Sequence, residues 1–393
     1  MAGMSFTEYV NAYYKGGLDI SKRYGISKAA DEATTADSAY FNTMYGATVF
    51  NQLNTKSDVF KLFRKEGWNQ SGWRVLTDRS LAAANKGIQE GGTFGASGSN
   101  VEGDIPDLAQ VKADVKEIVS PFTVTTRAAI LAEADDGVKG LAAFLRAQAA
   151  EAHSFYIDKM LCADPATAAV PASLHDMTPL MRIAGNNDQL GISGVDANEM
   201  DLYDLDRDGG ASWADAHVDD GNGTNRLLSL ELLDNVIQSA IENGASYQNL
   251  IFLTGHTQLA ELKRLILAGG PSNNGVFRMM MESANPKGTN GVASEPGQNL
   301  ETRVGYYDSI PIYATQHLAT ALTGSSGGTG MGPILLLDLE HLSVKIAAPT
   351  TFLAQEDLAN VQALKRNYAF MTAGEMICYK FASQGMIRDL KSA

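Results

Sequence analysis

The stretch VKGLAAFLRAQAAEAHSFYIDKMLC, Val138–Cys162, carries the strongest periodic signal in this chain of 393 residues. Its apolar and small residues recur at steps of three or four, at Val138, Leu141, Leu145, Ala149, Ala152, Tyr156 and Met160. This spacing places them on one face of a helix. No proline follows until Pro165, so the periodicity predicts one long helix of about 37 Å at 1.5 Å per residue.

The residues before this helix predict a strand. In VKADVKEIV, 111–119, Val111, Ala113 and Val115 alternate with charged residues, and the pattern continues through PFTVTT, 121–126. Such alternation is typical of a strand with one buried face. Further upstream, SDVFKLF, 57–63, predicts a short helix with Ser57 or Asp58 as its cap.

The segment between these two elements, 67–107, is polar and rich in glycine, and it predicts an extended, hairpin-like excursion. Within it, GTFGASG, 92–98, resembles a phosphate-binding loop, but it neither follows an apolar strand nor opens a helix. Trp68, Trp73 and Phe94 are candidates for contacts with a partner, and the alternative for the two tryptophans is the chain's own core.

The second half of the chain predicts a compact α/β unit. Ser229 is placed to cap a helix that ends at Gly244, NLIFLTG, 249–255, reads as a buried strand, and a second helix follows over Thr257–Leu267. Three further strand regions are VGYYDSIPIYAT, 304–315, GPILLLDLEHLSVKI, 332–346, and NYAFMTAGEMICYKF, 367–381.

Composition excludes several classes of function. The formal charge of −14 argues against a surface that grips phosphate backbones. We expect no membrane span and no signal peptide, because no long apolar window and no leader pattern occur. Cys162 and Cys378 are expected to be buried thiols in a reducing cytoplasm. The six histidines are dispersed without a catalytic motif, so we expect no enzyme and no catalytic residue.

One local motif has the spacing of a calcium-binding loop. Positions 1, 3, 5, 6, 9 and 12 of a twelve-residue loop are Asp204, Asp206, Asp208, Gly209, Ser212 and Asp215, and the Gly210 carbonyl stands at position 7. Alternate carboxylates directed at one centre provide the oxygen ligands that calcium prefers. The predicted metal ligands are therefore Asp204, Asp206, Asp208, Gly210, Ser212 and Asp215, with calcium as the structural cofactor. A solvated acidic turn is the alternative.

The order of these segments resembles the Hong Kong 97-type major capsid proteins of tailed viruses of bacteria and archaea. The likeness is carried by SDVFKLF, 57–63, EGDIPD, 102–107, VKADVKEIVSPFTVT, 111–125, the helix Val138–Cys162, NLIFLTGHTQLAELKRL, 249–265, GYYDSIPIYAT, 305–315, GPILLLDLEHLSVKI, 332–346, and MICYKFASQGMIRDL, 376–390. No motif is diagnostic alone, and the order carries the likeness.

The resemblance implies an α+β fold with an N-terminal arm, an extended loop, a peripheral domain with a spine helix, and an axial α/β domain. The expected boundaries are 1–65 for the arm and connecting helix, 66–105 for the extended loop, 106–164 for the peripheral domain, 165–345 for the axial domain with an acidic insertion at 193–224, and 346–393 for the return to the peripheral domain.

The function implied is that of a shell subunit in the virion capsid, assembled in the host cytoplasm. It would self-assemble into pentamers and hexamers of an icosahedral shell around double-stranded DNA, without sequence-specific binding. Portal, scaffold or protease, and decoration proteins are the expected partners, and no membrane is expected. The alternatives are an encapsulin-like nanocompartment shell that encloses an enzyme cargo, and a calcium-dependent adhesion or scaffold module.

Overall fold

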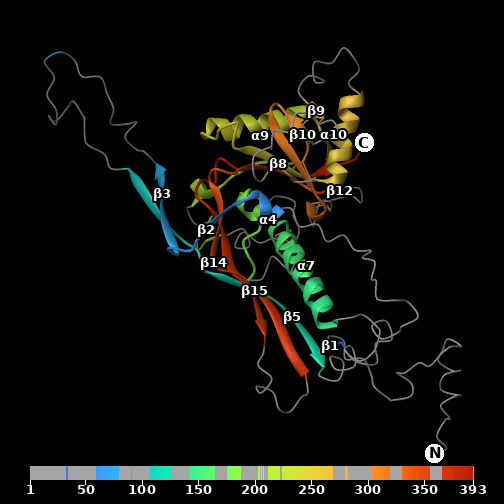
Figure 1. Cartoon of the computed structure of the whole chain (residues 1–393). Helices are drawn as coiled ribbons and strands as arrows, with labels where there is room; N and C mark the ends of the chain where they lie inside the picture. The colour runs from blue at the N-terminus through green and yellow to red at the C-terminus, as the bar shows by residue number, and fades with distance from the viewer. Residues whose placement is uncertain are drawn as a thin grey trace, which may run out of the picture. The chain divides into compact units, whose positions relative to one another are not determined.

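A computed structural model of the chain describes 32–33, 59–78, 90, 106–125, 141–163, 175–186, 202–203, 205, 207, 211–221, 224–268, 279–281, 303–318, 330–354 and 365–392 (Figure 1). The chain divides into two compact units. Unit 1 comprises Met1–Lys56, Val119–Phe155 and Thr350–Thr372, and unit 2 comprises Ser57–Ile118, Tyr156–Pro349 and Ala373–Ala393. The five-part boundaries expected from the sequence remain a prediction.

The largest sheet lies in unit 2 and has seven strands in the order β6-β16-β13-β8-β11-β10-β9. In chain order these are β6 His217–Asp219, β8 Leu250–Gly255, β9 Met279–Met281, β10 Arg303–Tyr307, β11 Ile310–Thr315, β13 Ile334–Asp338 and β16 Gly385–Ile387. Both parallel pairs, such as β11 with β8, and antiparallel pairs, such as β13 with β8, occur. The mixed sheet agrees with the α/β unit predicted for the second half of the chain.

The seven-stranded sheet is buried on both faces, because successive side chains of a strand point to opposite sides. Phe252 of β8 and Leu336 of β13 belong to one apolar cluster, together with the inner faces of two helices. Their neighbours Leu253 and Leu337 belong to a second cluster on the other face. This double burial explains why NLIFLTG and PILLLD read as continuous apolar runs.

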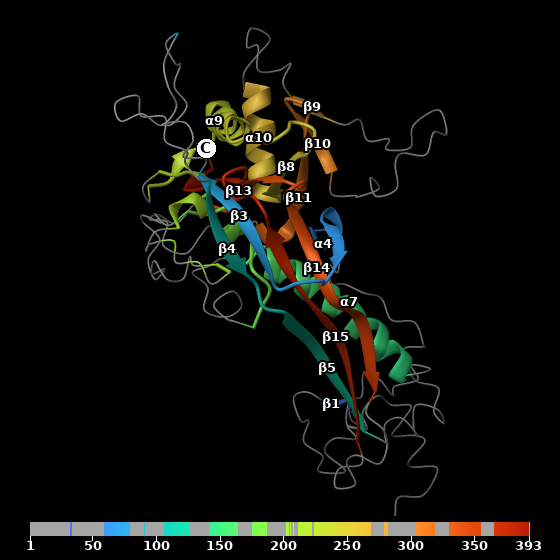
Figure 2. The ribbon, with the colours of Figure 1, turned by 90° about the vertical axis from the view of Figure 1, so that its left-hand side faces the viewer.

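Two helices of unit 2 supply one of these clusters: α9 Leu230–Glu242 and α10 His256–Ala268 (Figures 1 and 2). Ser229 occupies the predicted N-cap position of α9, but its side chain makes no capping hydrogen bond. At the other end Gly244 has φ +82°, and the Ala245 amide donates to the Ala240 carbonyl. Glycine adopts this left-handed conformation without a Cβ penalty, so the predicted helix end at Gly244 is confirmed.

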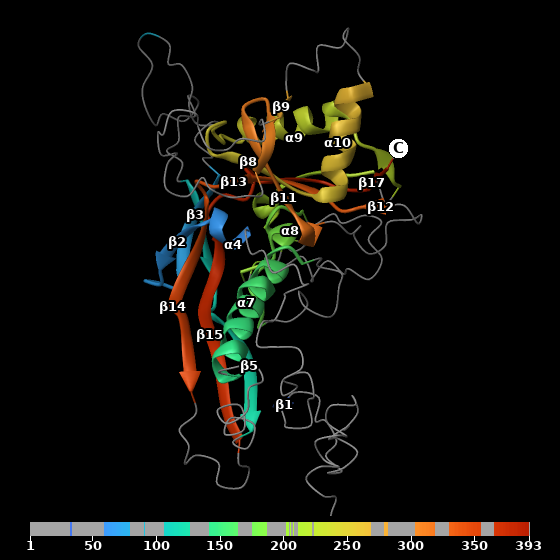
Figure 3. The same cartoon turned by 45° about the vertical axis from the view of Figure 1, so that its right-hand side comes forward.

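The long helix is α7, Leu141–Leu161, and it is confirmed (Figure 3). The described helix begins at Leu141, and the predicted first turn from Val138 lies outside the described residues. The face on which the spacing placed the apolar and small residues coincides only partly with the buried side of the helix. Ala152 is exposed whereas His153 is buried, because the buried side runs through His153, Ile157 and Leu161.

A five-stranded sheet has the order β1-β5-β15-β14-β2. Its strands are β1 Glu32–Ala33, β2 Arg64–Gly67, β5 Lys116–Thr125, β14 Leu342–Ala354 and β15 Lys365–Cys378. In unit 1, Phe122, Tyr368 and Phe352 stack across β5, β15 and β14, with ring centroids 5.1 and 5.6 Å apart. Arg146 of α7 lies over the Phe352 ring at 4.0 Å, so the helix packs on the aromatic face of this sheet.

The hairpin-like excursion begins as a two-stranded antiparallel sheet in unit 2, formed by β3 Gly72–Asp78 and β4 Asp107–Lys112 (Figure 2). The predicted hairpin is therefore confirmed at its base, and its remaining part, with Phe94, lies outside the described residues. The single strand expected over 111–126 is wrong. It is divided into β4 and β5, which pair in different sheets, and Val115 between them is exposed.

Shorter elements complete the described part of the chain: α4 Val59–Leu62, α8 Leu180–Ile183, η3 Ser212–Ala214, η5 Gln316–Leu318, and a three-stranded sheet of β12 Gly330–Met331, β17 Leu390–Lys391 and β7 Arg226–Leu227. The predicted caps of α4, Ser57 and Asp58, lie outside the described residues. The Asp158 carboxylate accepts hydrogen bonds from the Val59 and Phe60 amides at 3.2 and 2.8 Å. Among the described residues, no helix combines the length and apolarity that a membrane crossing requires.

Candidate functional site

The predicted calcium loop is only partly described. Asp204, Asp206, Asp208, Gly209 and Gly210 lie outside the described residues, and Ser212 opens η3. Asp215, the predicted twelfth ligand, lies 3.7 Å from Nε of Arg207. This carboxylate therefore has a cationic neighbour from within the same loop, and calcium binding stays a prediction.

Arg207 organises the described part of this loop. Its buried guanidinium donates from Nη1 to the Arg182 carbonyl at 2.9 Å and from Nη2 to the Ala214 carbonyl at 2.7 Å. Burial lowers the pKa of Arg207 to about 10, and the Asp215 carboxylate opposes that shift. An arginine stays charged at this value, so it can hold the loop against the core.

The segment that the sequence marked as an acidic insertion, 193–224, contributes to the core. Tyr203 has φ 55°, its ring is 5.3 Å from that of Trp73, and its hydroxyl donates to the Met376 carbonyl at 2.5 Å. Further along, β6 pairs in parallel with β16 at the end of the seven-stranded sheet. Trp73 is buried here, so the own-core alternative for Trp73 is confirmed, and Trp68 packs partly buried against the same cluster.

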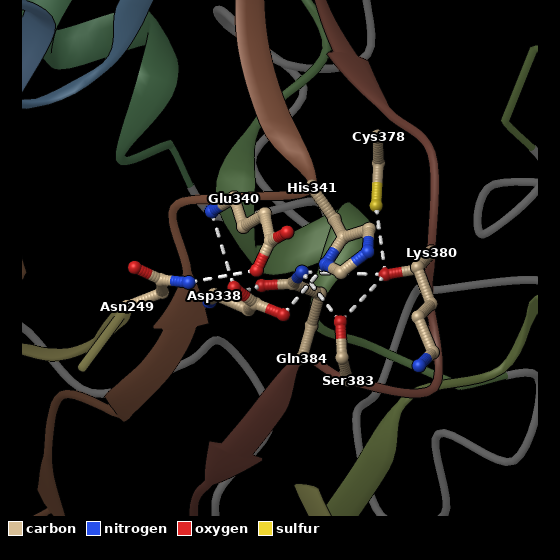
Figure 4. A network of polar contacts seen from close by, with 8 residues as sticks. All are labelled: Asn249, Asp338, Glu340, His341, Cys378, Lys380, Ser383 and Gln384. Atoms are coloured by element: carbon tan, nitrogen blue, oxygen red, sulfur yellow. Dashed lines mark hydrogen bonds and ion pairs between the residues drawn. The ribbon is translucent and has the colours of Figure 1, made fainter. Parts of the chain in front are cut away.

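A polar network, with Asp338 buried and Glu340 exposed, surrounds the turn between β13 and β14 (Figure 4). Asp338 accepts from the Glu340 amide at 3.1 Å, and its other carboxylate oxygen lies 2.7 Å from Nδ1 of His341. Asn249 donates to the Glu340 carboxylate at 2.7 Å, and the Gln384 side chain accepts from the Asp338 amide at 2.9 Å. The network joins the β13–β14 turn to the segment after β15.

Asp338, Glu340 and His341 each offer one donor atom, and these atoms lie within 4.8 Å of one another. Both carboxylate oxygens of Asp338 are already engaged within the turn. The arrangement fits a turn held by internal hydrogen bonds. Sequence reasoning passed over this cluster, and the signal was the D-x-E-H order directly after the apolar run ILLL.

The two cysteines are free and buried, as expected. The Cys378 thiol donates to the Lys380 carbonyl at 3.2 Å, and burial raises its pKa to about 12. Burial also raises the pKa of Cys162. Both residues therefore stay protonated and unreactive near neutral pH.

Unit 2 also buries a carboxylic acid. Glu375 of β15 accepts on Oε1 from the Thr178 and Met376 amides at 2.7 and 2.9 Å. Burial raises its pKa to about 7, although these amide hydrogen bonds oppose the shift. The folded chain thus holds a proton on Glu375 over a range in which the unfolded chain has lost it.

We expect the Glu375→Gln variant to gain stability above pH 7. Between about pH 4.5 and 7 only the folded state is protonated, so the wild type loses stability as pH rises through this window. A shift of this size corresponds to on the order of 3 kcal/mol. Urea unfolding at pH 5 and pH 8 should show a smaller pH dependence for Glu375→Gln, whereas the exposed control Glu117→Gln should keep the wild-type profile. An unaltered profile in Glu375→Gln would contradict the assignment.

A second group of buried charges fixes the C-terminal segment. Arg388, whose side chain is fully buried, donates from Nη2 to the Asp220 carboxylate at 2.7 Å. Its neighbour Asp389 accepts from the Gly221 amide at 3.1 Å, and the Arg226 amide donates to the Asp389 carbonyl at 2.7 Å. Arg226 also pairs with Asp219. These contacts join the end of the acidic insertion to β16 and β17.

The β3–β4 hairpin has two unlike faces. Trp73 and Val111 are paired across the strands and are buried in the core. On the opposite face the paired residues Leu76 and Leu108 are 48% and 61% exposed. A two-stranded sheet is marginally stable in water by itself. The exposed apolar pair makes the outer face of this hairpin a candidate contact surface.

Comparison with known proteins depends on the structure, since no protein-family model and no curated protein matches the sequence. The chain is similar to the solved structure of the cyanophage A-1(L) capsid asymmetric unit, with a TM-score of 0.56 and 15% identity. That match covers 88% of this chain and 96% of the phage chain.

Two capsid structures of GTA particles are also similar. The empty particle matches with a TM-score of 0.50 and 11% identity over 88% of this chain and 93% of the other. The native particle gives the same TM-score and identity over 91% and 99%. Likeness along nearly whole chains at such low identity shows a shared fold. The chain therefore has the α+β fold of Hong Kong 97-type capsid proteins, and the predicted resemblance to tailed-phage major capsid proteins is confirmed as a likeness of fold.

Proposed function

We propose that the chain is the major capsid protein of a tailed virus, which self-assembles into pentamers and hexamers of an icosahedral shell around double-stranded DNA. The observation that carries this proposal is the match to the cyanophage A-1(L) capsid chain over 88% of this chain and 96% of that one. Closed symmetry of this kind covers exposed edges and multiplies weak contacts.

The β3–β4 hairpin is the described surface best suited to such assembly. Its outer face offers Leu76 and Leu108, while Trp73 and Val111 anchor its inner face in unit 2. A hairpin that is anchored on one face and carries two exposed leucines on the other can pack against a second copy of the chain. Burying the leucines in that contact would remove apolar area from water.

Electron microscopy of the recombinant full chain tests the proposal directly. We expect closed shells or rings of five and six subunits. A chain that stays monomeric at high concentration, with no partner able to assemble it, would contradict the proposed function. Double-stranded DNA in native particles supports a virus, whereas an enzyme cargo would support the encapsulin-like alternative.

The proposed location is the virion capsid, after assembly in the host cytoplasm. Portal, scaffold or protease, and decoration proteins are its proposed partners. A net charge of −14 suits a shell that encloses DNA without sequence-specific binding, because an acidic surface does not attract the phosphate backbone. We assign no catalytic role to any residue, since an assembly function needs surfaces and no reaction.

The loop from Asp204 to Asp215 is proposed to bind calcium as a structural ion. The support is the spacing of its carboxylates in the sequence and the glycine at position 6. A bound ion would stabilise the segment that leads into η3 and β6. The calcium-dependent adhesion alternative accounts for this loop alone and leaves the capsid fold unexplained.

Calcium is expected to raise the melting temperature of the full chain, and excess EDTA to reverse the rise. At a hundredfold excess over Kd, binding to the folded state alone adds about 2.7 kcal/mol to the free energy of unfolding. The double variant Asp204→Asn and Asp206→Asn should abolish the response, and the exposed control Asp114→Asn should retain it. Equal melting temperatures of the wild type in calcium and in EDTA would refute the site.

A further inference from the structure

We propose that His153 forms an acid-sensitive contact, which holds the unit 1 part of helix α7 on its sheet until the imidazole is protonated. The contact consists of His153, Ser120, Thr372 and Thr350, all of which lie in unit 1. The proposal does not rest on the proposed function, since it concerns the folded chain itself.

The geometry joins one side chain of the helix to three strands. His153 is 2% exposed, and Nδ1 lies 2.8 Å from Oγ of Ser120 on β5. Nε2 lies 2.7 Å from Oγ1 of Thr372 on β15, and that hydroxyl lies 2.8 Å from Oγ1 of Thr350 on β14. A buried position of this kind on a helix usually holds an apolar residue. Here it holds an imidazole whose two nitrogens are both hydrogen-bonded.

Neutral imidazole suits these partners, since one ring nitrogen donates, the other accepts, and a hydroxyl can do either. An imidazolium donates from both nitrogens, so both hydroxyls must accept. Thr372 must then direct its own proton toward Thr350. Protonation of His153 therefore fixes the donor and acceptor roles of the Ser120 and Thr372 hydroxyls, and it adds a positive charge inside the protein.

That charge would have no counter-ion in the contact. Among the side chains of unit 1 that the structure describes, the charged groups on the packed elements are Arg146 and Glu151 of α7. No hydrogen bond or ion pair joins either of these two groups to the imidazole. Glu151 is exposed, and it lies two residues from His153, where a helix directs side chains to different faces.

The direction of the pH effect follows from burial. Desolvation lowers the pKa of His153, so below about pH 6.5 the unfolded chain takes up a proton that the folded chain resists. The folded state then binds fewer protons, and stability is lost as pH falls through this range. Glu375 in unit 2 acts in the opposite sense, because its stabilising effect is largest in acid. Mild acid is therefore expected to weaken unit 1 selectively.

Hydrogen exchange of the full chain, corrected for intrinsic rates, tests this inference. Between pH 7.5 and pH 5 we expect protection of the amides in 141–155 to fall at least about fivefold, the effect of a modest loss of local stability. His153→Gln keeps a donor and an acceptor but cannot gain a charge, so its protection should not change with pH. The exposed histidine control His256→Gln should behave as wild type.

A second measurement is the protonation midpoint of His153 in the wild type, read from exchange at its imidazole C2 position by mass spectrometry. It must coincide with the midpoint for loss of protection in 141–155, and this comparison decides the matter if His153→Gln does not fold. Unchanged wild-type protection, separate midpoints, or an equal pH response in a folded His153→Gln variant would overturn the proposal.

Discussion

Replacing Leu76 by Lys and Leu108 by Glu in the same chain is expected to prevent shell assembly while the subunit stays folded. The two residues are direct partners across β3 and β4, and they are 48% and 61% exposed. Opposite charges at paired positions keep a favourable cross-strand contact, so the hairpin itself should persist. The substitutions therefore remove only the apolar surface that a second copy of the chain would cover.

The magnitude follows from that area. Burying a leucine fully is worth about 1.5–3 kcal/mol, and each subunit of a shell would lose this at every equivalent contact. A loss of about 1.4 kcal/mol per contact already raises a dissociation constant tenfold. We therefore expect the concentration needed for assembly to rise by at least about tenfold, as measured by light scattering and electron microscopy.

The matched control is Tyr247→Ser, which removes an exposed apolar side chain of unit 2 outside the hairpin. It should assemble as the wild type does, and circular dichroism melting should show both variants folded. Normal assembly of the charged double variant would exclude the outer face of the hairpin as an assembly surface.

The elements that the sequence predicted well are those whose pattern is set by burial on both sides or by a helical repeat. NLIFLTG became β8 and ILLLD became β13, because a strand between two apolar layers needs consecutive apolar residues. The α7 helix was predictable from its length and its lack of proline. Gly244 was predictable because a helix end with positive φ favours glycine.

The face of α7 was harder to predict, because hydrophobicity misleads at His153. The spacing placed Ala152 on the apolar face of the predicted helix, yet Ala152 is exposed and its neighbour His153 is buried. The reason is the pair of hydroxyls from β5 and β15, which lie 33 and 219 residues away in sequence. Polar partners at such separations cannot be read from a local period.

The same limit applies to the acidic insertion. Its spacing predicted a metal site or a solvated acidic turn over Asp204–Asp215, and nothing in the sequence singled out Asp219 and Asp220. These two residues pair with Arg226 and Arg388. The partner Arg388 is 168 residues away, so only the fold brings the two charges together. A sequence with several acidic residues and a distant arginine predicts neither the pair nor its burial.

Arg388→Ala is expected to destabilise unit 2 strongly. Its side chain is fully buried and donates to Asp220 at 2.7 Å, so its removal leaves a carboxylate and its surroundings without their charge partner. Breaking a buried ion pair in this way costs about 3–5 kcal/mol. Urea unfolding at pH 7 should show this loss, and hydrogen exchange should locate it in β6, β16 and β17.

The control variant is Arg264→Ala, which shows how much stability is lost when an exposed ion pair, and not a buried one, is removed. Arg264 pairs with Glu261 at a similar distance of 2.7 Å, but its side chain is 57% exposed. Solvent screens such a pair, so Arg264→Ala should cost no more than about 1 kcal/mol. If Arg388→Ala were as mild as Arg264→Ala, the charge cluster would not be what fixes the C-terminal segment. The apolar contacts of Ile387 and Leu390 with the α9 and α10 cluster would then hold that segment by themselves.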